Sequence, residues 1–233
     1  MSIPVTTASR SMLINRFHVF NTMDWLERYF RQLHIVNQDR LSRSRVLVVG
    51  VGGLGNIVAT ELALAGVGII HLVDPDAIEV HNLNRQFLYR DADVGKPKAD
   101  VAARRLAEMN PYISIRGFVG HWEDLDLSDY DIVVDCMDIW REKVALSRAC
   151  SCTLVTGSVG EDLGLVSVLV SKTLPAAPIR SVAGGSMLGA RVAAVGAFMA
   201  NEVLRELSGQ PSPLRDRLLH IDFGRMMFTT LGL

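Results

Sequence analysis

A glycine-rich turn follows a short apolar run near position 50 and is the first sign of nucleotide chemistry. The run is Arg45-Val-Leu-Val-Val49, and the turn contains Gly50, Gly52, Gly53 and Gly55 in the pattern G-x-G-x-x-G. Such glycines permit a tight turn, a close approach of backbone to phosphate, and close packing of the following helix on the strand. A helix that starts near position 56 would direct free N–H groups at that phosphate. The pattern alone fits a dinucleotide site, an ATP site or a structural turn.

Charged residues further along the chain favour a triphosphate over a dinucleotide. A second apolar run ends at Asp74, where an acidic side chain can bind ribose hydroxyls. The polar segments 82–86 and 95–98 then add the cations Arg85 and Lys98. A pyrophosphate that is already neutralised by a nicotinamide ring has little use for two further cations, whereas a triphosphate would use them.

Two carboxylates follow a third apolar run, Asp131-Ile-Val-Val134. Asp135 and Asp138 lie just beyond it, and ligands of open α/β sheets bind beyond the carboxyl ends of the strands. One of the two could hold Mg²⁺ on phosphate oxygens. Taken singly, Asp74 and Asp138 could instead cap a turn and a helix, and the two cations could be solvated surface charges.

In their order and spacing, these segments resemble the MoeB/ThiF/HesA family, the bacterial and organellar relatives of ubiquitin-activating enzymes. The resemblance covers roughly residues 25 to 230. It is carried by Arg28-Tyr-Phe-Arg-Gln32, Gly50 to Gly55, Val73-Asp-Pro-Asp76, Asn82 to Gln86, Gly95 to Lys98, Asn110-Pro111 and Asp135-Cys-Met-Asp138. Matches in this order are more specific than any one of them.

The resemblance implies a role for each polar residue. It implies a ribose contact from Asp74, phosphate contacts from Asn82, Arg85 and Lys98, further nucleotide contacts from Asp76, Gln86 and the glycines of the turn, and a magnesium ligand in Asp138. It also implies a homodimer in which Arg31 reaches the γ-phosphate bound by the partner subunit.

The reaction that the resemblance implies is the adenylation of a carboxylate. In this family the C-terminal glycine of a small ubiquitin-like carrier protein, with a tail ending in Gly-Gly, attacks the α-phosphate of ATP and pyrophosphate leaves. Such transfers depend on positioning and on cations that neutralise the leaving phosphates, which suits Arg, Lys and Mg²⁺.

Other functions remain open at this stage. An adenylating relative could act on a peptide tail or a tRNA-attached carboxylate, and a non-catalytic scaffold could keep only the fold. An NAD-dependent oxidoreductase is disfavoured, because no His/Asp or Tyr/Lys pair with a known catalytic logic accompanies the glycine-rich turn.

The chain departs from the family pattern in its cysteines and in one crossover segment. Cys136, Cys150 and Cys152 include no C-x-x-C pair, so we expect no zinc. No later cysteine could take over the activated tail, so we expect the reaction to stop at adenylation. The segment 170–187, where relatives cover the carrier's tail, is short, and Ile139 stands where relatives commonly have Asn.

Composition excludes several classes of protein. The 233 residues are 49% hydrophobic and 21% charged, which suits one α/β domain with a single core. A net charge of −1 with interleaved signs argues against nucleic-acid binding. No apolar run reaches the roughly 18 residues of a membrane span. Three scattered cysteines favour a reducing compartment, and we expect a cytoplasmic protein.

The chain is expected to consist of an N-terminal extension, residues 1–23, and a single ATP-binding adenylation domain, residues 24–233. The extension contains Arg, Ser and Thr but no acidic residue, as organellar transit peptides do, so import into an organelle is left open. Met23-Asp-Trp-Leu-Glu-Arg28 is a natural opening for a family member, which favours an extension on a cytoplasmic protein.

Alternating apolar and helical segments predict the elements that position these residues. Strands are expected at about 46–49, 69–73, 115–119, 132–135, 153–156 and 165–170, and helices at about 56–65, 97–109, 140–150 and 187–207. The order implies a Rossmann-like, doubly wound, mostly parallel sheet. The last helix is apolar on nearly all sides, which predicts burial against the sheet and a partner subunit. The segment 218–231 predicts an antiparallel hairpin through Gly224.

Overall fold

The computed structural model describes residues 22–177 and 186–233. The chain divides into two compact units, Met1–Ile35 and Val36–Leu233. The predicted division into an extension and a single adenylation domain at residue 23 stays a prediction.

The described part of the first unit is short and helical. It contains helix α2, Thr22–Glu27, and the 3-10 turn η1, Phe30–Gln32. The rings of Trp25 and Tyr29 meet edge to face with their centroids 5.6 Å apart, an arrangement that aromatic pairs prefer. Arg31 lies in η1.

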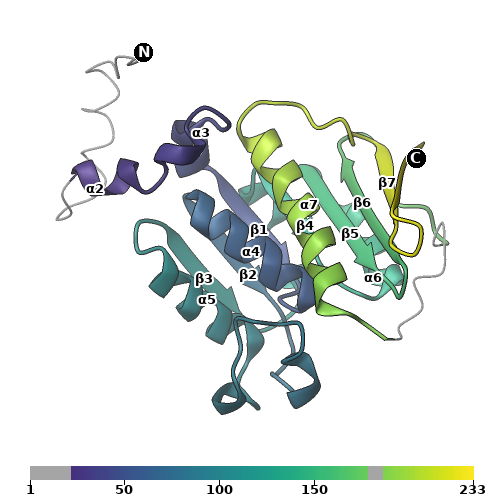
Figure 1. The fold of residues 1–233 in the computed structure, drawn as a ribbon, viewed down its shortest axis with the longest axis horizontal. Helices are drawn as coiled ribbons and strands as arrows, with labels where there is room; N and C mark the ends of the chain where they lie inside the picture. Colours follow the sequence, from purple (N-terminus) through teal and green to yellow (C-terminus); the bar gives the residue numbers. More distant parts are fainter. Residues whose placement is uncertain (1–21, 178–185) are drawn as a thin grey trace. The chain divides into compact units, whose positions relative to one another are not determined.

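The second unit is built on one eight-stranded sheet with the order β3-β2-β1-β4-β5-β6-β7-β8 (Figure 1). The strands are β1 Arg45–Val49, β2 Ile69–Val73, β3 Ser114–Phe118, β4 Ile132–Asp135, β5 Thr153–Val159, β6 Leu163–Leu169, β7 Arg217–Asp222 and β8 Met227–Gly232. The first five strands pair in parallel, and β6, β7 and β8 continue the sheet in antiparallel pairs. The predicted α/β class, mostly parallel sheet and C-terminal hairpin are confirmed, and the antiparallel part also includes β6.

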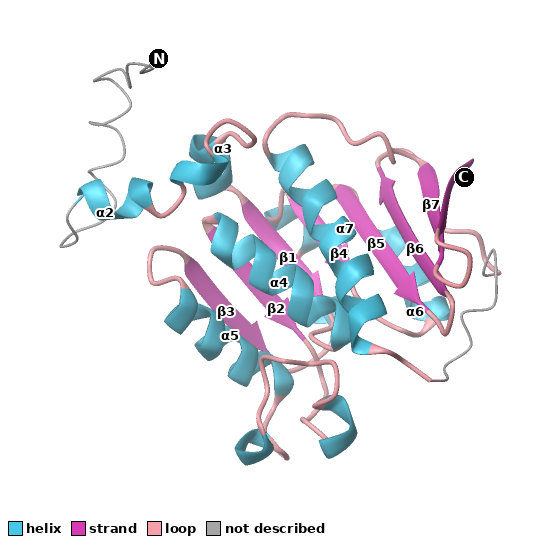
Figure 2. Ribbon diagram, viewed as in Figure 1, coloured by secondary structure: helices cyan, strands magenta, loops and turns pink. Residues whose placement is uncertain are grey.

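Helices cover both faces of this sheet. They are α3 Gln38–Arg43, α4 Gly53–Ala65, α5 Lys98–Met109, α6 Trp140–Ala149 and α7 Gly189–Leu207. Figure 2 shows α4, α5 and α7 on one face and α6 on the other. None of the helices in the described ranges combines the length and the hydropathy needed to cross a membrane.

Each face of the sheet has its own apolar core. Side chains alternate along a strand, so Val46 and Val48 of β1 pack into the core beneath α4, α5 and α7. Leu47 and Val49 point the other way, into the core that α6 completes. Burial on both faces explains why β1 reads as a continuous apolar run.

Helix α7 is buried on the side that faces α4 and the sheet. Val195 and Met199 are fully buried there, whereas Phe198 is partly exposed. At Gly196 an added Cβ would lie 2.7 Å from the Ile57 Cβ of α4, so the absence of a side chain lets the two helices approach closely. The predicted burial against the sheet is confirmed, and burial against a partner subunit stays a prediction.

The hairpin between β7 and β8 forms where it was predicted. Gly224 lies in its turn, but the residue that adopts the left-handed conformation is Met226, with a φ of 53°. A positive φ at a long side chain is uncommon and carries a conformational cost.

Replacing Gly196 by alanine tests the close contact between α4 and α7. Alanine is favoured over glycine inside a helix by about 1 kcal/mol, but overpacking a core typically costs about 1–3 kcal/mol. We expect a net loss of free energy of unfolding, measured by urea denaturation. Ala197→Ser, at the adjacent exposed position, is the control and should change stability by only about 0.5 kcal/mol. A gain in stability for Gly196→Ala would show that the helices are not in tight contact.

Candidate functional site

The loops that follow the first four strands surround one pocket of about 700 Å³. Its lining includes Gly50 after β1, Asp74 after β2, Gly120 after β3 and Asp138 after β4. Parallel strands bring these loops to one edge of the sheet. Because β1 lies between β2 and β4, the pocket also sits at the point where the chain order reverses, which is where open α/β sheets bind ligands.

The glycines of the turn differ in what a side chain would meet. Gly50 has a φ of 85°, a conformation that favours glycine. A Cβ at Gly55 would lie 2.0 Å from the Gly50 carbonyl oxygen, so no side chain fits there. At Gly52 the nearest atom is the Gln86 side-chain nitrogen at 3.6 Å, so this residue has open space where it lines the pocket. Helix α4 begins at Gly53, earlier than predicted, and its first turn therefore belongs to the pocket.

Two buried side chains that sequence reasoning missed hold this turn in place. The Val51 carbonyl oxygen accepts hydrogen bonds from the Tyr89 hydroxyl at 2.7 Å and from the Asn56 amide at 2.8 Å. The Asn56 side-chain oxygen accepts the Leu88 N–H at 2.9 Å. Burial raises the pKa of Tyr89 far above its usual range, so the hydroxyl stays a donor. A polar Asn in an apolar helix was the signal that could have indicated this role.

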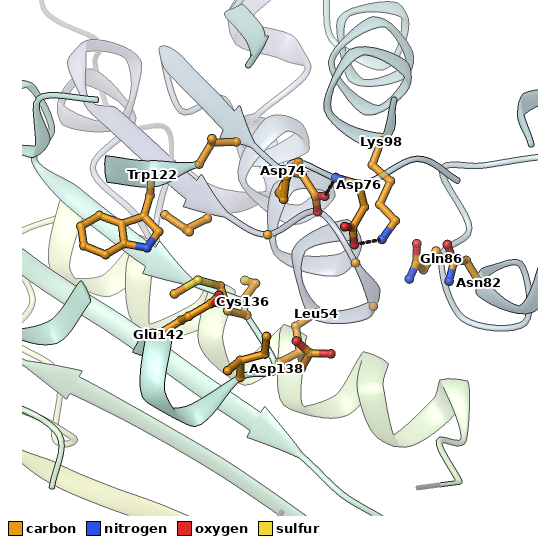
Figure 3. A pocket seen from close by; sticks show the side chains of 18 of the residues that line it. Leu54, Asp74, Asp76, Asn82, Gln86, Lys98, Trp122, Cys136, Asp138 and Glu142 are labelled. Atoms are coloured by element: carbon orange, nitrogen blue, oxygen red, sulfur yellow. Dashed lines mark hydrogen bonds and ion pairs between the residues drawn. The ribbon is translucent and has the colours of Figure 1, made fainter. Parts of the chain in front are cut away.

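Asp74, Asp76 and Lys98 come together at one wall of the pocket (Figure 3). Asp74 is 5% exposed, and its two oxygens accept the N–H groups of Val51 at 2.6 Å and Asp76 at 2.8 Å. Burial raises its pKa. The bond to the Asp76 N–H is the turn cap that the sequence offered as an alternative role for Asp74. A carboxylate has about four acceptor sites, so Asp74 can still accept hydrogen bonds from ribose hydroxyls. Lys98 Nζ lies 2.8 Å from an Asp76 oxygen.

Arg85, Asn82 and Gln86 line the same pocket. Arg85 Nη1 donates to the His81 carbonyl and to the Asn84 side chain, both at 2.9 Å. These two bonds orient its guanidinium group. Gln86 is 3% exposed, and its side-chain oxygen has no hydrogen-bond partner among the described residues. The amide nitrogen, 3.6 Å from where a Gly52 Cβ would lie, is the part of this side chain that a ligand in the pocket could contact.

Asp138 is exposed in the connection between β4 and α6. The N-cap of α6 is Ile139 and makes no side-chain cap bond, so the alternative that Asp138 caps this helix is wrong. Within the described ranges, no three His, Cys, Asp or Glu side chains are placed to hold a metal ion. Mg²⁺ commonly uses one or two carboxylates together with substrate phosphates. Asp138 therefore fits a magnesium ion that is shared with the phosphate oxygens of a ligand.

Further lining residues were not singled out from the sequence. They include Gly120, His121, Trp122 and Glu123 after β3, Trp140 and Glu142 at the start of α6, Ser158 of β5, and Met187 and Val192 near the start of α7. The segment after β3 could have been found, because it follows the carboxyl end of a parallel strand as the predicted loops do.

Some expectations are not tested by this geometry. Arg31 lies in the first unit, and its role at the γ-phosphate stays a prediction. Of the short segment expected to cover a carrier's tail, residues 178–185 fall outside the described residues. Cys150 and Cys152 are free thiols with their sulfurs 3.3 Å apart, and the expected lack of zinc stays a prediction.

Comparison with known proteins gives consistent results. The model of the ThiF family matches residues 26–233. A sulfur carrier protein adenylyltransferase from Thermus thermophilus is 35% identical, and the match covers 86% of this chain and 84% of the relative. The molybdopterin-synthase adenylyltransferase of Escherichia coli strain K12 is 30% identical, with 84% and 86% covered. The chain spans only 45% and 52% of two longer relatives named adenylyltransferase and sulfurtransferase, from Aspergillus terreus and Drosophila sechellia.

A solved structure shows the same fold. The crystal structure of E. coli MccB with AMPCPP and MccA has a TM-score of 0.71, at 24% sequence identity, and covers 88% of this chain and 71% of that chain. At this identity the likeness concerns the fold alone.

Alanine at two glycines of the turn should separate binding from folding. Gly52→Ala is expected to leave the thermal midpoint within about 2 °C, because its Cβ meets nothing close, while weakening ATP binding by blocking the approach of phosphate. Gly55→Ala is expected to destabilise the fold by about 1–3 kcal/mol or more through its clash with Gly50. Thermal unfolding and calorimetric titration with ATP measure both effects. Undiminished ATP binding by Gly52→Ala would exclude phosphate from this part of the pocket.

Proposed function

Since this chain belongs to the ThiF family, we propose that it adenylates the C-terminal glycine carboxylate of a small ubiquitin-like, sulfur-carrier type protein, using ATP and releasing pyrophosphate. The observation that carries the proposal is the pocket itself. Its lining combines a glycine-rich turn, a helix N-terminus, the cations Arg85 and Lys98, and several carboxylates at the switch point of the sheet. The relatives named adenylyltransferases match over more than four fifths of both chains.

The reaction is a transfer of AMP to a carboxylate. A carboxylate oxygen of the carrier's last glycine attacks the α-phosphorus of ATP. The bond from that phosphorus to the oxygen shared with the β-phosphate breaks, and pyrophosphate leaves with the negative charge. The products are an acyl adenylate and pyrophosphate. The protein accelerates such a step by aligning the two reactants and by neutralising the leaving group.

Several residues that line the pocket have a proposed contact with part of the nucleotide. Asp74 binds the ribose, and Arg85 and Lys98 neutralise the phosphates that leave. Asn82 and Gln86 add amide hydrogen bonds, and the first turn of α4 offers backbone N–H groups. Lys98 has three donors, so it can contact a phosphate while it keeps Asp76 as a partner.

The exposed Asp138 carboxylate is the proposed protein ligand of magnesium, because it lines the pocket that would hold the phosphates. When bound, Mg²⁺ would neutralise phosphate charge and so favour departure of pyrophosphate. Arg31 is proposed to complete the site from a partner subunit, as the resemblance to the family implies.

The charges of the pocket also bear on the alternative functions. An NAD-dependent oxidoreductase would leave both Arg85 and Lys98 without a task. A non-catalytic scaffold would not need the exposed carboxylate of Asp138 in the lining of the pocket. A peptide tail or a tRNA-attached carboxylate would use the same chemistry, so the choice of acceptor has to be measured directly.

A homodimer is supported by one exposed apolar surface. Phe198 of α7 and Phe228 of β8 meet edge to face with ring centroids 5.8 Å apart. Phe228 is 54% exposed, and Met226, Met227 and Leu231 are exposed beside it along the sequence. β8 is also an edge strand, whose unpaired backbone groups favour covering by another chain. A second copy of this chain is the proposed cover.

We also propose that the protein works in the cytoplasm as one adenylation domain with an N-terminal extension. Three free thiols, Cys136, Cys150 and Cys152, are compatible with a reducing compartment. Organellar import directed by residues 1–23 is the alternative, and an intact Met1 in the native protein, measured by mass spectrometry, would argue against it.

ATP–pyrophosphate exchange in the presence of magnesium tests the function. Purified protein is assayed with a panel of carriers ending in Gly-Gly, with short peptides and with no acceptor. Exchange that requires a Gly-Gly carrier supports the proposal. Exchange with peptides alone would show that the acceptor is a peptide tail. Binding of NAD without binding of ATP would overturn the proposal.

Substitutions at the two walls of the pocket should abolish most of this exchange. Arg85→Ala and Asp138→Ala are each expected to lower the rate by at least about 100-fold, the scale on which one preorganised charged group contributes. Arg148→Ala removes an exposed charge of α6 that does not line the pocket and should retain full activity. Full exchange by either of the first two variants contradicts the proposed site.

The apolar surface on α7 and β8 predicts the oligomeric state. Phe228→Asp is expected to convert a dimer into monomers, because a charge would be buried without a partner at the interface. Light scattering coupled to size-exclusion chromatography measures the mass. Ser114→Asp adds the same charge at an exposed position of β3, the opposite edge strand, and should stay dimeric. A wild-type monomer would refute the homodimer.

A further inference from the structure

Next to the candidate site, Asp135 at the end of β4 and Lys143 of α6 form a fully buried ion pair. Lys143 Nζ lies 2.9 Å from Asp135 Oδ2, and the side chains are 1% and 0% exposed. Among the ion pairs of the described residues, no other has both partners buried. Burying two charges costs free energy that their attraction often fails to return, and apolar residues of similar volume can stabilise a core equally well. Stability alone therefore does not explain the pair.

Two further hydrogen bonds of the pair converge on one residue of the β4–α6 connection, Met137. Lys143 Nζ donates to the Met137 carbonyl at 2.9 Å. Asp135 Oδ1 accepts the Met137 N–H at 3.1 Å. The two charged groups thus hold Met137 by both its donor and its acceptor. The other Asp135 oxygen accepts the Thr156 hydroxyl of β5 at 2.7 Å, which ties the arrangement to the neighbouring strand.

Asp138 is the next residue along the chain. Its short side chain reaches only a small volume from a given backbone position, so the place of its carboxylate depends on how this backbone is held. The Cys136 N–H donates to the Val49 carbonyl at 2.8 Å and continues the contact of β1 with β4 by one residue. Beyond Cys136, the connection is held by the hydrogen bonds of Asp135 and Lys143 to Met137 instead of by strand pairing.

The pair lies behind the pocket and not in it. Cys136 to Trp140 and Glu142 line the pocket, whereas Asp135 and Lys143 do not. Neither charge is therefore placed to contact ATP. Any influence on the reaction has to pass through the Met137 peptide groups to Asp138.

The geometry points to Asp135 and Lys143 as positioning residues, which hold the connection so that the Asp138 carboxylate meets the magnesium ion of a bound Mg·ATP. This inference rests on the proposed function, because it concerns the ligand of that site. It assigns to the ion pair a task in metal binding that neither residue performs by direct contact.

Three variants and one control test the pair. Lys143→Met removes the charge at similar length, and Lys143→Arg keeps the charge and the donors. The double variant Asp135→Leu/Lys143→Met replaces both charges with apolar side chains, so it should fold even if the single change leaves a damaging unpaired carboxylate. Glu202→Gln alters another buried carboxylate, on α7, which bonds to Ser212 and does not line the pocket.

The readouts are the free energy of unfolding in urea, the magnesium dependence of ATP binding by calorimetry, and kcat and KM in pyrophosphate exchange. For Lys143→Met and the double variant, we expect the half-saturating Mg²⁺ concentration to rise, and kcat to fall, by about 10- to 100-fold, the usual effect of removing an outer partner of a metal ligand. KM for the carrier should stay unchanged. Lys143→Arg should restore most of the magnesium affinity, and Glu202→Gln should not alter it.

The outcomes separate this inference from the proposed function. Carrier-dependent exchange by the wild type, together with unchanged magnesium dependence in the folded double variant, overturns the inference alone. If Glu202→Gln showed the same magnesium defect, the defect would come from general destabilisation, and this result would also overturn the inference. If the wild type binds ATP without catalysing exchange, the calorimetric comparison still decides the role of the pair. Binding of ATP that needs no magnesium overturns it as well.

Discussion

The pocket depends on the parallel pairing of β1 with both β2 and β4. Val49 is paired with Val73 on one side and with Asp135 on the other, so the residues that follow these strands leave the sheet at the same level. A slip of one residue would exchange the two faces of a strand and would separate the glycine-rich turn from its neighbours. Gly50 makes this closeness possible, because an added Cβ would lie only 3.1 Å from the Cys136 carbonyl oxygen.

Around this edge, buried polar side chains fix the loops without help from a ligand. Asn56 and Tyr89 hold the Val51 carbonyl, Asp74 holds the Val51 N–H, and the Asp135 and Lys143 pair holds Met137. Each of these contacts pairs a buried polar group, as an interior of low dielectric requires. The loops are thus preorganised, and a preorganised charged site does not have to reorganise its dipoles when charge moves during reaction.

The sequence allowed the elements and most of the pocket to be predicted because both are encoded locally. Apolar runs located the strands, and residues directly after a strand had to lie at its carboxyl end. The residues that hold the loops were missed for the opposite reason, since Asn56 meets Leu88 and Tyr89 meets Val51 only after folding. Local preference also misled at the ends of elements. A glycine is unfavourable inside a helix but tolerated in its first turn, so α4 starts within the turn. In the β7–β8 turn, Met226 takes the left-handed conformation although Gly224 lies two residues before it.

The charges left for a ligand are arranged so that they can change partners. The Lys98 side chain is 8% exposed, which holds its ammonium group in one place, whereas its partner Asp76 is 64% exposed. An exposed carboxylate loses little when it returns to water, because water can solvate it again. An incoming phosphate can therefore take a share of Lys98 at small cost, while the carboxylate keeps the buried cation neutralised until then. The same logic does not extend to the Lys143 and Asp135 pair, in which both groups are inaccessible. One ion pair next to the pocket can thus be shared with a ligand, and the other is fixed.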